Sequence, residues 1–270
     1  MAALGLDARE ARLEVQLLLQ HALGASRAML LAYPERALTV EQDAVYQGLL
    51  ARRLQGEPVA YLFGEREFYG LNLAVTPATL IPRPETELLV ELALERLRGR
   101  AAPRVLDLGT GSGAIALALA HSRPDAAVTA CDASADALAV AQRNAVRLGL
   151  ANVGFVQSDW FAALGEQPYD LIASNPPYIV DHDPHLQQGD VRFEPRTALA
   201  SGPDGLDDIR RIVAAAPARL DPGGWLLLEH GYDQAPAVRA LLETAGFAEV
   251  FSACDLAGIE RVSGGRKPAD

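Results

Sequence analysis

Leucine and alanine recur at helical spacing over residues 7–53. Leu13, Leu17 and Leu18 share one face of a helix drawn through them, and Tyr33-Pro34 interrupts the pattern before it resumes. This periodicity predicts a small helical bundle at the start of the chain.

Two β-prone runs follow within residues 61–75 and meet near Tyr69-Gly70. Turn-forming residues between two such runs predict a β-hairpin. We therefore expect a helical domain over residues 1–58, a hairpin linker over 59–80 and a second domain over 81–270, with a frayed tail over 264–270.

Beyond Arg104, short apolar runs alternate with amphipathic segments, which implies parallel strands joined by helical crossovers. Strands are predicted at 104–108, 128–132, 153–159, 170–174, 225–229, 247–253 and 261–263. Helices are predicted from about residue 113, over 135–148, near 206–220 and around 234–245, with Gly223-Gly224 as the turn before the strand at 225–229. This order is typical of a doubly wound α/β domain.

Composition narrows the classes of function. The 270 residues carry a net charge of −11, so the surface as a whole repels phosphate backbones and favours a protein partner over nucleic acid. No apolar run is long enough to span a membrane and the N-terminus lacks a signal-peptide core, so we expect a cytoplasmic protein. Cys131 and Cys254 suggest neither a disulfide framework nor a metal cluster, and both are expected to be buried and inert.

A glycine-rich turn follows the predicted strand at 104–108. Glycine permits positive φ and close approach of a ligand, but such a loop alone can serve a dinucleotide, a phosphate or only a tight turn. Asp107, inside the strand, changes this interpretation, because an acid there suits a cationic ligand and repels a diphosphate. S-adenosylmethionine, with its sulfonium and ammonium, fits this requirement. The expected loop contacts are Gly109, Thr110, Gly111, Ser112 and Gly113.

Acidic residues also end the next two predicted strands. Asp132 can accept hydrogen bonds from both ribose hydroxyls, and Asp159 with Trp160 can hold and cover an adenine. Each has a simpler alternative, since a strand-end Asp is often a helix N-cap and a Trp is often core. Successive strand ends nevertheless meet at one crevice, where open α/β sheets bind ligands.

Taken in this order, the residues of the loop and strand ends resemble the class I S-adenosylmethionine-dependent methyltransferases. The resemblance implies a doubly wound, mostly parallel, seven-stranded Rossmann-like sheet whose last strand is antiparallel. It also implies S-adenosylmethionine as the methyl donor.

Asn175-Pro176-Pro177-Tyr178 (NPPY) follows the predicted strand at 170–174 and looks like the amino-group grip of methyltransferases that modify a planar nitrogen. An amide nitrogen is a poor nucleophile because its lone pair is delocalised, so a site must hold and polarise it. The Asn175 oxygen and the Pro176 carbonyl can each accept one N–H, and Tyr178 offers a stacking face. Pro176 and Pro177 keep the loop rigid. The alternative is a rigid turn with a packed tyrosine.

Four further segments indicate which kind of substrate carries the amino group. They are Leu80–Glu87, whose last seven residues read IPRPETE, Phe193–Leu199 (FEPRTAL), Gly202–Leu206 (GPDGL) and Leu228–Gly231 (LEHG). With the helical N-terminus and the hairpin, they resemble the peptide chain release factor N5-glutamine methyltransferases, the PrmC/HemK family, over nearly the whole chain. The resemblance implies methylation of the glutamine in the Gly-Gly-Gln motif of release factors, which the N-terminal domain holds. It also implies that Arg83 and Glu85 line the site, with Glu85 near the cofactor's ammonium.

Other roles and targets stay open at this stage. Pro84 and Glu85 can simply start a helix, and Arg196 is expected to brace the NPPY loop, with substrate contact or a surface ion pair as alternatives. Glu229 and His230 are expected to lie away from the transfer point, His230 as a structural hydrogen-bond donor. The rival functions are methylation of a ribosomal-protein glutamine, methylation of adenine N6, and cofactor binding without turnover.

Overall fold

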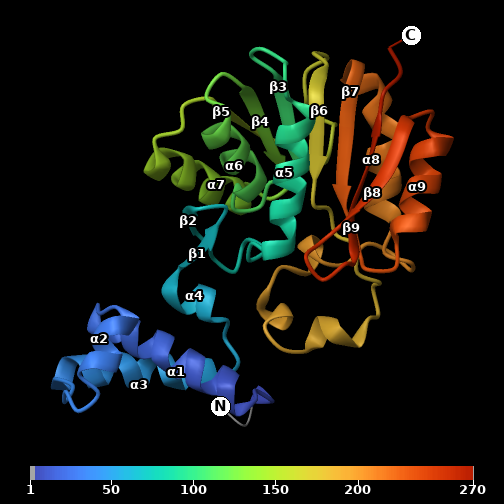
Figure 1. The fold of residues 1–270 in the computed structure, drawn as a ribbon. Helices are drawn as coiled ribbons and strands as arrows, with labels where there is room; N and C mark the ends of the chain where they lie inside the picture. Colours follow the sequence, from blue (N-terminus) through green and yellow to red (C-terminus); the bar gives the residue numbers. More distant parts are fainter. Residues whose placement is uncertain (1–3, 270) are drawn as a thin grey trace.

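The computed structural model describes residues 4–269, so the first three residues of the expected N-terminal domain and Asp270 of the expected tail lie outside the described part. The chain begins with the helices α1 (Ala8–Leu23), α2 (Arg27–Ala32), α3 (Val40–Leu54) and α4 (Val59–Phe63). The first three pack together at one corner of the molecule, and α4 leads into the rest (Figure 1). The expected helical bundle is confirmed.

Side-chain caps explain where the longer bundle helices begin. Asp7 and Glu10 form a capping box at the start of α1, and Thr39 and Gln42 form another at the start of α3. The bundle buries little apolar surface of its own, and Leu18 is its one fully buried large side chain among the described residues. The bundle is therefore an accessory layer rather than a large core.

The predicted hairpin is also confirmed. β1 (Glu65–Phe68) pairs antiparallel with β2 (Leu71–Ala74), and Tyr69-Gly70 both take positive φ, as a two-residue hairpin turn requires. Residues 61–63, expected in the first run, belong instead to α4. Phe68 and Leu73 are buried in the core of the larger domain, so the hairpin is packed onto that domain.

Seven strands form one sheet in the order β5-β4-β3-β6-β7-β9-β8. They are β3 (Arg104–Leu108), β4 (Ala127–Asp132), β5 (Val153–Gln157), β6 (Tyr169–Ser174), β7 (Leu220–Glu229), β8 (Ala248–Cys254) and β9 (Glu260–Arg266). β3 to β7 run parallel, and β9 is antiparallel to both β7 and β8. The doubly wound, seven-stranded fold with an antiparallel last strand is confirmed.

Helices cover both faces of the sheet (Figure 1). α5 (Glu87–Arg96), α6 (Ala114–Ser122) and α7 (Ala135–Leu148) lie on one face, and α8 (Asp207–Ala215) and α9 (Ala235–Thr244) on the other. Side chains alternate along β3, so Val105 enters the first core while Leu106 and Leu108 enter the second. Asp107 therefore points with Val105 toward α6.

Short 3-10 helices complete the fold. η2 (Pro84–Thr86) precedes α5, η6 (Ala216–Arg219) follows α8, and η3 (Pro184–Gln187), η4 (Val191–Phe193) and η5 (Arg196–Ala198) lie in the long connection after β6. This connection lies beyond the carboxyl ends of the parallel strands, on the side that faces the bundle (Figure 1). It therefore borders the region where the sequence places the site.

The far end of the sheet differs from the prediction in two places. β7 begins at Leu220, so Gly223-Gly224 lie within the strand and not in a turn before it. Glycine fits there because the strand is irregular and a Cβ on Gly224 would lie 3.0 Å from the Tyr169 carbonyl oxygen. β9 continues to Arg266, and Lys267 exchanges backbone hydrogen bonds with this glycine pair, so the expected fraying is wrong for residues 264–267.

Cys131 is buried, as expected, but Cys254 is exposed at the end of the edge strand β8, so that expectation is wrong. Within residues 4–269 no group of three or more His, Cys, Asp or Glu side chains is arranged to hold a metal ion. Nor does any helix in this range have the length and apolar character that crossing a membrane requires.

Arg53 ties the bundle to the larger domain. This α3 side chain is only 4% exposed, and its guanidinium pairs with Glu14 at 2.7 Å and with Asp190 at 3.0 Å. It also donates to the backbone carbonyls of Gly56 and Glu57. A single buried cation thus links α1, α3 and the connection after β6.

Arg53→Ala should lower the free energy of unfolding by about 3 kcal/mol, because it removes a buried cation and leaves Glu14 and two backbone carbonyls without their donor. The neighbouring Arg52→Ala is the matched control: Arg52 is half exposed and pairs with Glu57 at the surface, so its loss should cost less than about 1 kcal/mol. Urea unfolding followed by circular dichroism compares them. Equal losses would contradict the linking role of Arg53.

Candidate active site

A cavity of about 520 Å³ opens beside the carboxyl ends of β3, β4, β5 and β6. Ten of the residues expected at the site line it: Arg83, Gly109, Thr110, Gly111, Ser112, Asp132, Asp159, Trp160, Asn175 and Pro177. Five others lie outside its lining: Glu85, Asp107, Gly113, Pro176 and Tyr178. The glycine loop and the NPPY loop thus share one cavity.

Asp107 lies beneath the glycine loop, fully buried. Its Oδ2 accepts hydrogen bonds from the Thr110 hydroxyl at 2.6 Å and from the backbone N–H of Ala116 at 3.1 Å. Its Oδ1 is buried and has no hydrogen-bonding partner within residues 4–269. Burial raises the pKa of Asp107 to about 7, although both hydrogen bonds act to lower it. The carboxyl fixes the loop and keeps one oxygen for a further donor.

The three loop glycines all take positive φ but have different structural roles. The Trp160 ring lies against Gly109, and no atom would lie within 4 Å of a Cβ on Gly111. A Cβ on Gly113 would meet Leu117 of α6 at 2.9 Å and Ala141 of α7 at 3.2 Å. Gly109 and Gly111 therefore leave room in the cavity, whereas Gly113 lets α6 pack closely.

Asp132 ends β4 on the cavity wall. Its Oδ2 accepts the backbone N–H of Gly111 and its Oδ1 that of Ser134, both at 2.9 Å. The simpler alternative for Asp132 was a helix N-cap, but Ser134 caps α7. Each carboxylate oxygen retains a lone pair, so Asp132 can orient the loop and still accept from a ligand.

Asp159 and Trp160 follow β5 and differ in their surroundings. The Asp159 side chain is 60% exposed and pairs with Arg211 at 2.7 Å. Trp160 takes a positive φ of 48°, and its Nε1 donates to Asp208 at 3.0 Å. This hydrogen bond holds the indole beside the glycine loop, where it can cover a flat ligand.

Asn175 directly follows β6 and lies on the cavity wall. Its Nδ2 donates to the Thr86 hydroxyl at 3.2 Å. Thr86 is buried at the end of η2, so the IPRPETE segment orients the NPPY side chain. Because the nitrogen is held by Thr86, Oδ1 is the atom that can accept a hydrogen bond from a ligand in the cavity.

Tyr178 packs toward the second core, and its hydroxyl donates to Glu229 Oε1 at 3.2 Å. Burial raises the pKa of Tyr178. Glu229 is only 2% exposed; burial raises its pKa to about 7, while its interactions with Thr86 and Tyr178 act to lower it. Glu229 does not line the cavity, but its contact with Tyr178 places it beside the NPPY loop, because β6 and β7 are neighbouring parallel strands whose ends meet.

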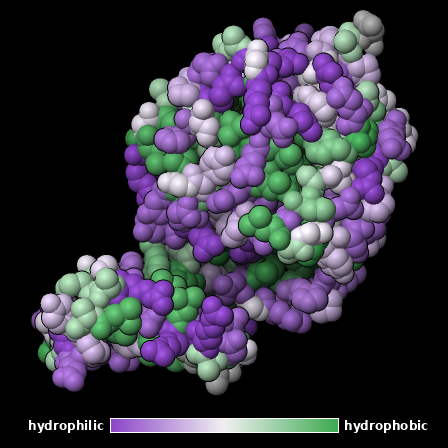
Figure 2. Space-filling model, in the orientation of Figure 1, coloured by the Kyte–Doolittle hydropathy of each residue, from purple (hydrophilic) through white to green (hydrophobic). Residues whose placement is uncertain are grey.

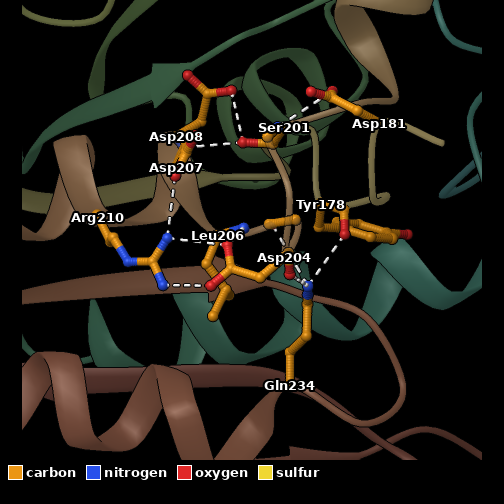
Figure 3. A network of polar contacts seen from close by, with 11 residues as sticks. Tyr178, Asp181, Ser201, Asp204, Leu206, Asp207, Asp208, Arg210 and Gln234 are labelled. Atoms are coloured by element: carbon orange, nitrogen blue, oxygen red, sulfur yellow. Dashed lines mark hydrogen bonds and ion pairs between the residues drawn. The ribbon is translucent and has the colours of Figure 1, made fainter.

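The backbone of the NPPY loop is braced by Gln234, the N-cap residue of α9, and by the GPDGL segment (Figure 3). Gln234 Nε2 donates to the Tyr178 carbonyl at 3.0 Å. Gly205 lies so close that a Cβ there would come within 2.2 Å of the same carbonyl oxygen, which explains one glycine of GPDGL. Ser201 and Asp208 exchange two hydrogen bonds of 2.8 Å beside this loop. No motif in the sequence pointed to Gln234.

The IPRPETE and FEPRTAL segments are joined by one ion pair. Arg83 lies 2.5 Å from Glu194, whose side chain is fully buried. Burial raises the pKa of Glu194, and Arg83 opposes that shift. Arg196 donates to the Asp181 carbonyl at 2.7 Å, so this contact lies three residues beyond the NPPY loop that Arg196 was expected to brace. Of Arg83, Glu194 and Arg196, Arg83 is the residue that lines the cavity.

His230 and Glu85 do not line the cavity. His230 is fully buried, with its ring nitrogens 2.7 Å from the Ser263 hydroxyl and 2.9 Å from the Gly231 carbonyl, and burial lowers its pKa. This agrees with the expected structural role. The charge of Glu85 raises the pKa of Glu229, which places Glu85 near that carboxyl.

Two family models match the chain: the PrmC N-terminal domain at residues 3–64 and the methyltransferase small domain at residues 85–191. The release factor glutamine methyltransferase of Bordetella pertussis is 60% identical over 255 residues and covers 94% of each chain. That of Burkholderia pseudomallei is 56% identical and covers 97% of this chain and 93% of its own. The chain belongs to the release factor glutamine methyltransferase family.

A solved structure adds information on the cofactor. The 16S rRNA N2 methyltransferase RsmC from T. thermophilus, in complex with AdoMet and guanosine, is 26% identical, with a TM-score of 0.55, and the match covers 75% of this chain and 49% of that chain. This member of the release factor glutamine methyltransferase family is therefore an S-adenosylmethionine-dependent methyltransferase.

The described residues fit that cofactor. The cavity volume lies in the range of small-molecule sites. The unpartnered Asp107 Oδ1 lies below the loop, and Asp132 has spare acceptor capacity on the wall. A carboxylate complements a cationic ligand, and burial strengthens that attraction. This chain therefore has the acids and the open glycines that the cofactor requires.

Binding of S-adenosylmethionine should change the intrinsic fluorescence, because Trp160 lines the cavity whereas the other tryptophan, Trp225, is buried in the core. Trp160→Phe should abolish most of the fluorescence change. Calorimetry should still detect binding, with a binding free energy weaker by about 1 kcal/mol or less. Trp225→Phe is the matched control and should retain the signal. A change of equal size in the Trp160→Phe variant would place the ligand elsewhere.

Proposed function

We propose that this chain transfers the methyl group of S-adenosylmethionine to the side-chain amide nitrogen of the glutamine in the Gly-Gly-Gln motif of peptide chain release factors. The hydrogen bond from Asn175 Nδ2 to Thr86 carries the proposal, because it turns the amide oxygen into the acceptor of the cavity. An acceptor oxygen suits a substrate that offers two N–H groups. The names of the relatives support glutamine as the bearer of that NH2 group.

Asp107, Asp132 and Trp160 are assigned to the cofactor. When bound, S-adenosylmethionine supplies an electrophilic methyl group on a sulfonium. Asp107 would offer its free Oδ1 to positive charge, and Asp132 would accept from hydroxyls while it holds Gly111. Trp160 would cover the flat ring beside Gly109. Gly109 to Gly113 supply the turn, and Asp159, tied to Arg211, contributes less.

The NPPY loop is assigned to the acceptor. Asn175 Oδ1 and the Pro176 carbonyl would each accept one N–H of the glutamine amide, which favours a nitrogen closer to tetrahedral as charge develops. Pro177 lines the cavity and keeps the loop rigid, and Tyr178 supports it from behind. A nitrogen–carbon bond forms as the methyl leaves sulfur, and the nitrogen then releases a proton to water, so no protein base is needed.

The helical bundle is assigned to recognition of the release factor. Of the large apolar side chains that are exposed, several lie on the bundle, among them Leu31, Tyr33 and Val40, the last 83% exposed. Figure 2 shows apolar side chains at the surface of the bundle and a hollow between it and the larger domain. Exposed apolar groups gathered on one surface are typical of a protein-binding site.

This arrangement supports a recognition domain over residues 1–58, a linker over 59–80 and a catalytic domain over 81–270. Arg83, at the cavity wall, is assigned to the substrate. Glu85 stays a candidate for the cofactor's ammonium although it does not line the cavity. A cytoplasmic location suits a translation-factor substrate, and neither nucleic acid nor a membrane is an expected partner of a chain with a net charge of −11.

Incubation with methyl-labelled cofactor and release factors that carry Gln or Ala in the Gly-Gly-Gln motif tests the proposal. Label should enter the Gln form alone. Equal labelling of both forms would contradict the proposed target residue. A ribosomal-protein substrate and an adenine-containing oligonucleotide, included in the same assay, should stay unlabelled; preferential labelling of either would overturn the proposal in favour of that substrate.

A further inference from the structure

Glu229 is a buried carboxyl that the proposed methyl transfer leaves unused. It ends β7, and its Oε1 accepts the Tyr178 hydroxyl at 3.2 Å. Its Oε2 is buried without a hydrogen-bonding partner in the described part of the chain. A buried carboxyl with one unsatisfied oxygen is costly for folding, so its place beside the NPPY loop calls for a function.

The Thr86 hydroxyl connects this carboxyl to Asn175. Thr86 accepts a hydrogen bond from Asn175 Nδ2 at 3.2 Å, so its own hydrogen must point to another acceptor. Thr86 also interacts with the Glu229 carboxyl, which is the buried acceptor next to it. A charged carboxylate only accepts, so it would draw the Thr86 hydrogen to itself and turn the Thr86 lone pairs toward Asn175.

We propose that Glu229 is a positioning residue that sets the direction of the hydrogen bonds in the acceptor site. In its ionised form it accepts from Thr86 and from Tyr178. Thr86 is then an acceptor for Asn175, and Asn175 must present its oxygen to the substrate amide. This inference rests on the proposed function, because only an amino-group substrate requires an acceptor at that position.

A group that can donate at position 229 would reverse this order. A protonated Glu229, or a glutamine in its place, can give a hydrogen to Thr86. The Thr86 hydrogen can then turn to Asn175, whose amide would flip and offer N–H groups to a substrate that also offers N–H groups. The site would still bind the cofactor but would no longer grip the amide.

The charged and titratable groups around Glu229 set the pH at which this occurs. Tyr178 faces it from the NPPY loop, Glu85 from η2 and Arg261 from β9; Arg261 favours the charged form and Glu85 opposes it. Burial is the largest effect and raises the pKa of Glu229 to about 7. Activity should therefore rise with pH through this value, whereas the folded state gains stability from this group at low pH and loses it as pH rises through 7.

The first test compares steady-state kinetics with a release factor substrate. Glu229→Gln and Thr86→Val should each lower kcat about tenfold to a hundredfold, as when the partner that orients a functional group is lost, and leave the Kd of S-adenosylmethionine within about twofold. Thr86→Ser, which keeps the hydroxyl, should restore most of the activity. Ser263→Ala, a buried hydroxyl on the neighbouring β9, is the matched control and should leave kcat unchanged.

The second test uses pH. The kcat of the wild-type protein should decrease as the pH drops below about 7. This decrease should be absent from Glu229→Gln. Without substrate, Glu229→Gln should raise the Tm relative to wild type at pH 8 and raise it less at pH 5. Wild-type kinetics in Glu229→Gln, or loss of its activity in step with loss of Tm, would overturn the inference. Failure of the wild type to label the Gln form would instead overturn the proposed function.

Discussion

Asn175→Ala should lower kcat about a hundredfold to a thousandfold, the usual cost of removing a group that contacts the reacting atoms in the transition state. The variant loses the oxygen that accepts the substrate N–H, but the glycine loop, Asp107 and Asp132 stay in place. The Kd of S-adenosylmethionine should therefore stay within about threefold of the wild-type value. Single-turnover kinetics and calorimetry measure the two quantities separately.

Asn152→Ala is the matched control for this prediction. Asn152 Nδ2 donates to three backbone carbonyls, each at 3.2 Å, beside the start of β4. Its loss should cost about 1 to 3 kcal/mol of stability, because buried carbonyls lose their donor, and leave turnover at wild-type level. If Asn175→Ala weakens cofactor binding as much as it lowers kcat, the residue serves the cofactor and not the amide.

Asp132→Ala should weaken binding of S-adenosylmethionine about tenfold to a hundredfold, with a smaller effect on kcat at saturating cofactor. Two losses combine in this variant. The ligand loses a charged acceptor on the cavity wall, and the Gly111 N–H loses the carboxylate that fixes the glycine loop. Equilibrium binding by calorimetry gives the change in Kd directly.

Asp159→Ala is the companion variant. Asp159 also lines the cavity and follows the strand β5, but its side chain is largely exposed and paired with Arg211. Exposed ion pairs contribute little, so its loss should change the Kd by less than about fivefold. An equal loss of affinity in both variants would mean that the adenine-side contact matters as much as the ribose-side one.

The sheet and the glycine loop were predictable because each depends on local pattern. Apolar runs at 104–108 and 170–174 specify buried strands, and the loop glycines need positive φ wherever the ligand lies. Parallel order then brings Asp132, Trp160 and Asn175 to one cavity without further information. Most of the cofactor site follows from these rules.

Contacts between distant segments were not predictable in this way. Thr86 and Glu229 are 143 positions apart in sequence, and only the meeting of η2 with the end of β7 makes them neighbours. Gln234, just before α9, supports the Tyr178 carbonyl and was not predictable for the same reason. The strand irregularity at Gly223-Gly224 depends on packing against Tyr169, which periodicity does not encode. The orientation of the acceptor grip therefore required the structure.

If the NPPY loop presents an acceptor oxygen to a glutamine side chain, the methyl group must reach the nitrogen of that side chain. Tandem mass spectrometry of a release factor incubated with the wild-type protein and S-adenosylmethionine locates the methyl group. We expect one added methyl group on the side-chain nitrogen of the Gly-Gly-Gln glutamine, and none with Asn175→Ala over the same time. A methyl group on any other residue, or full methylation by Asn175→Ala, would contradict it.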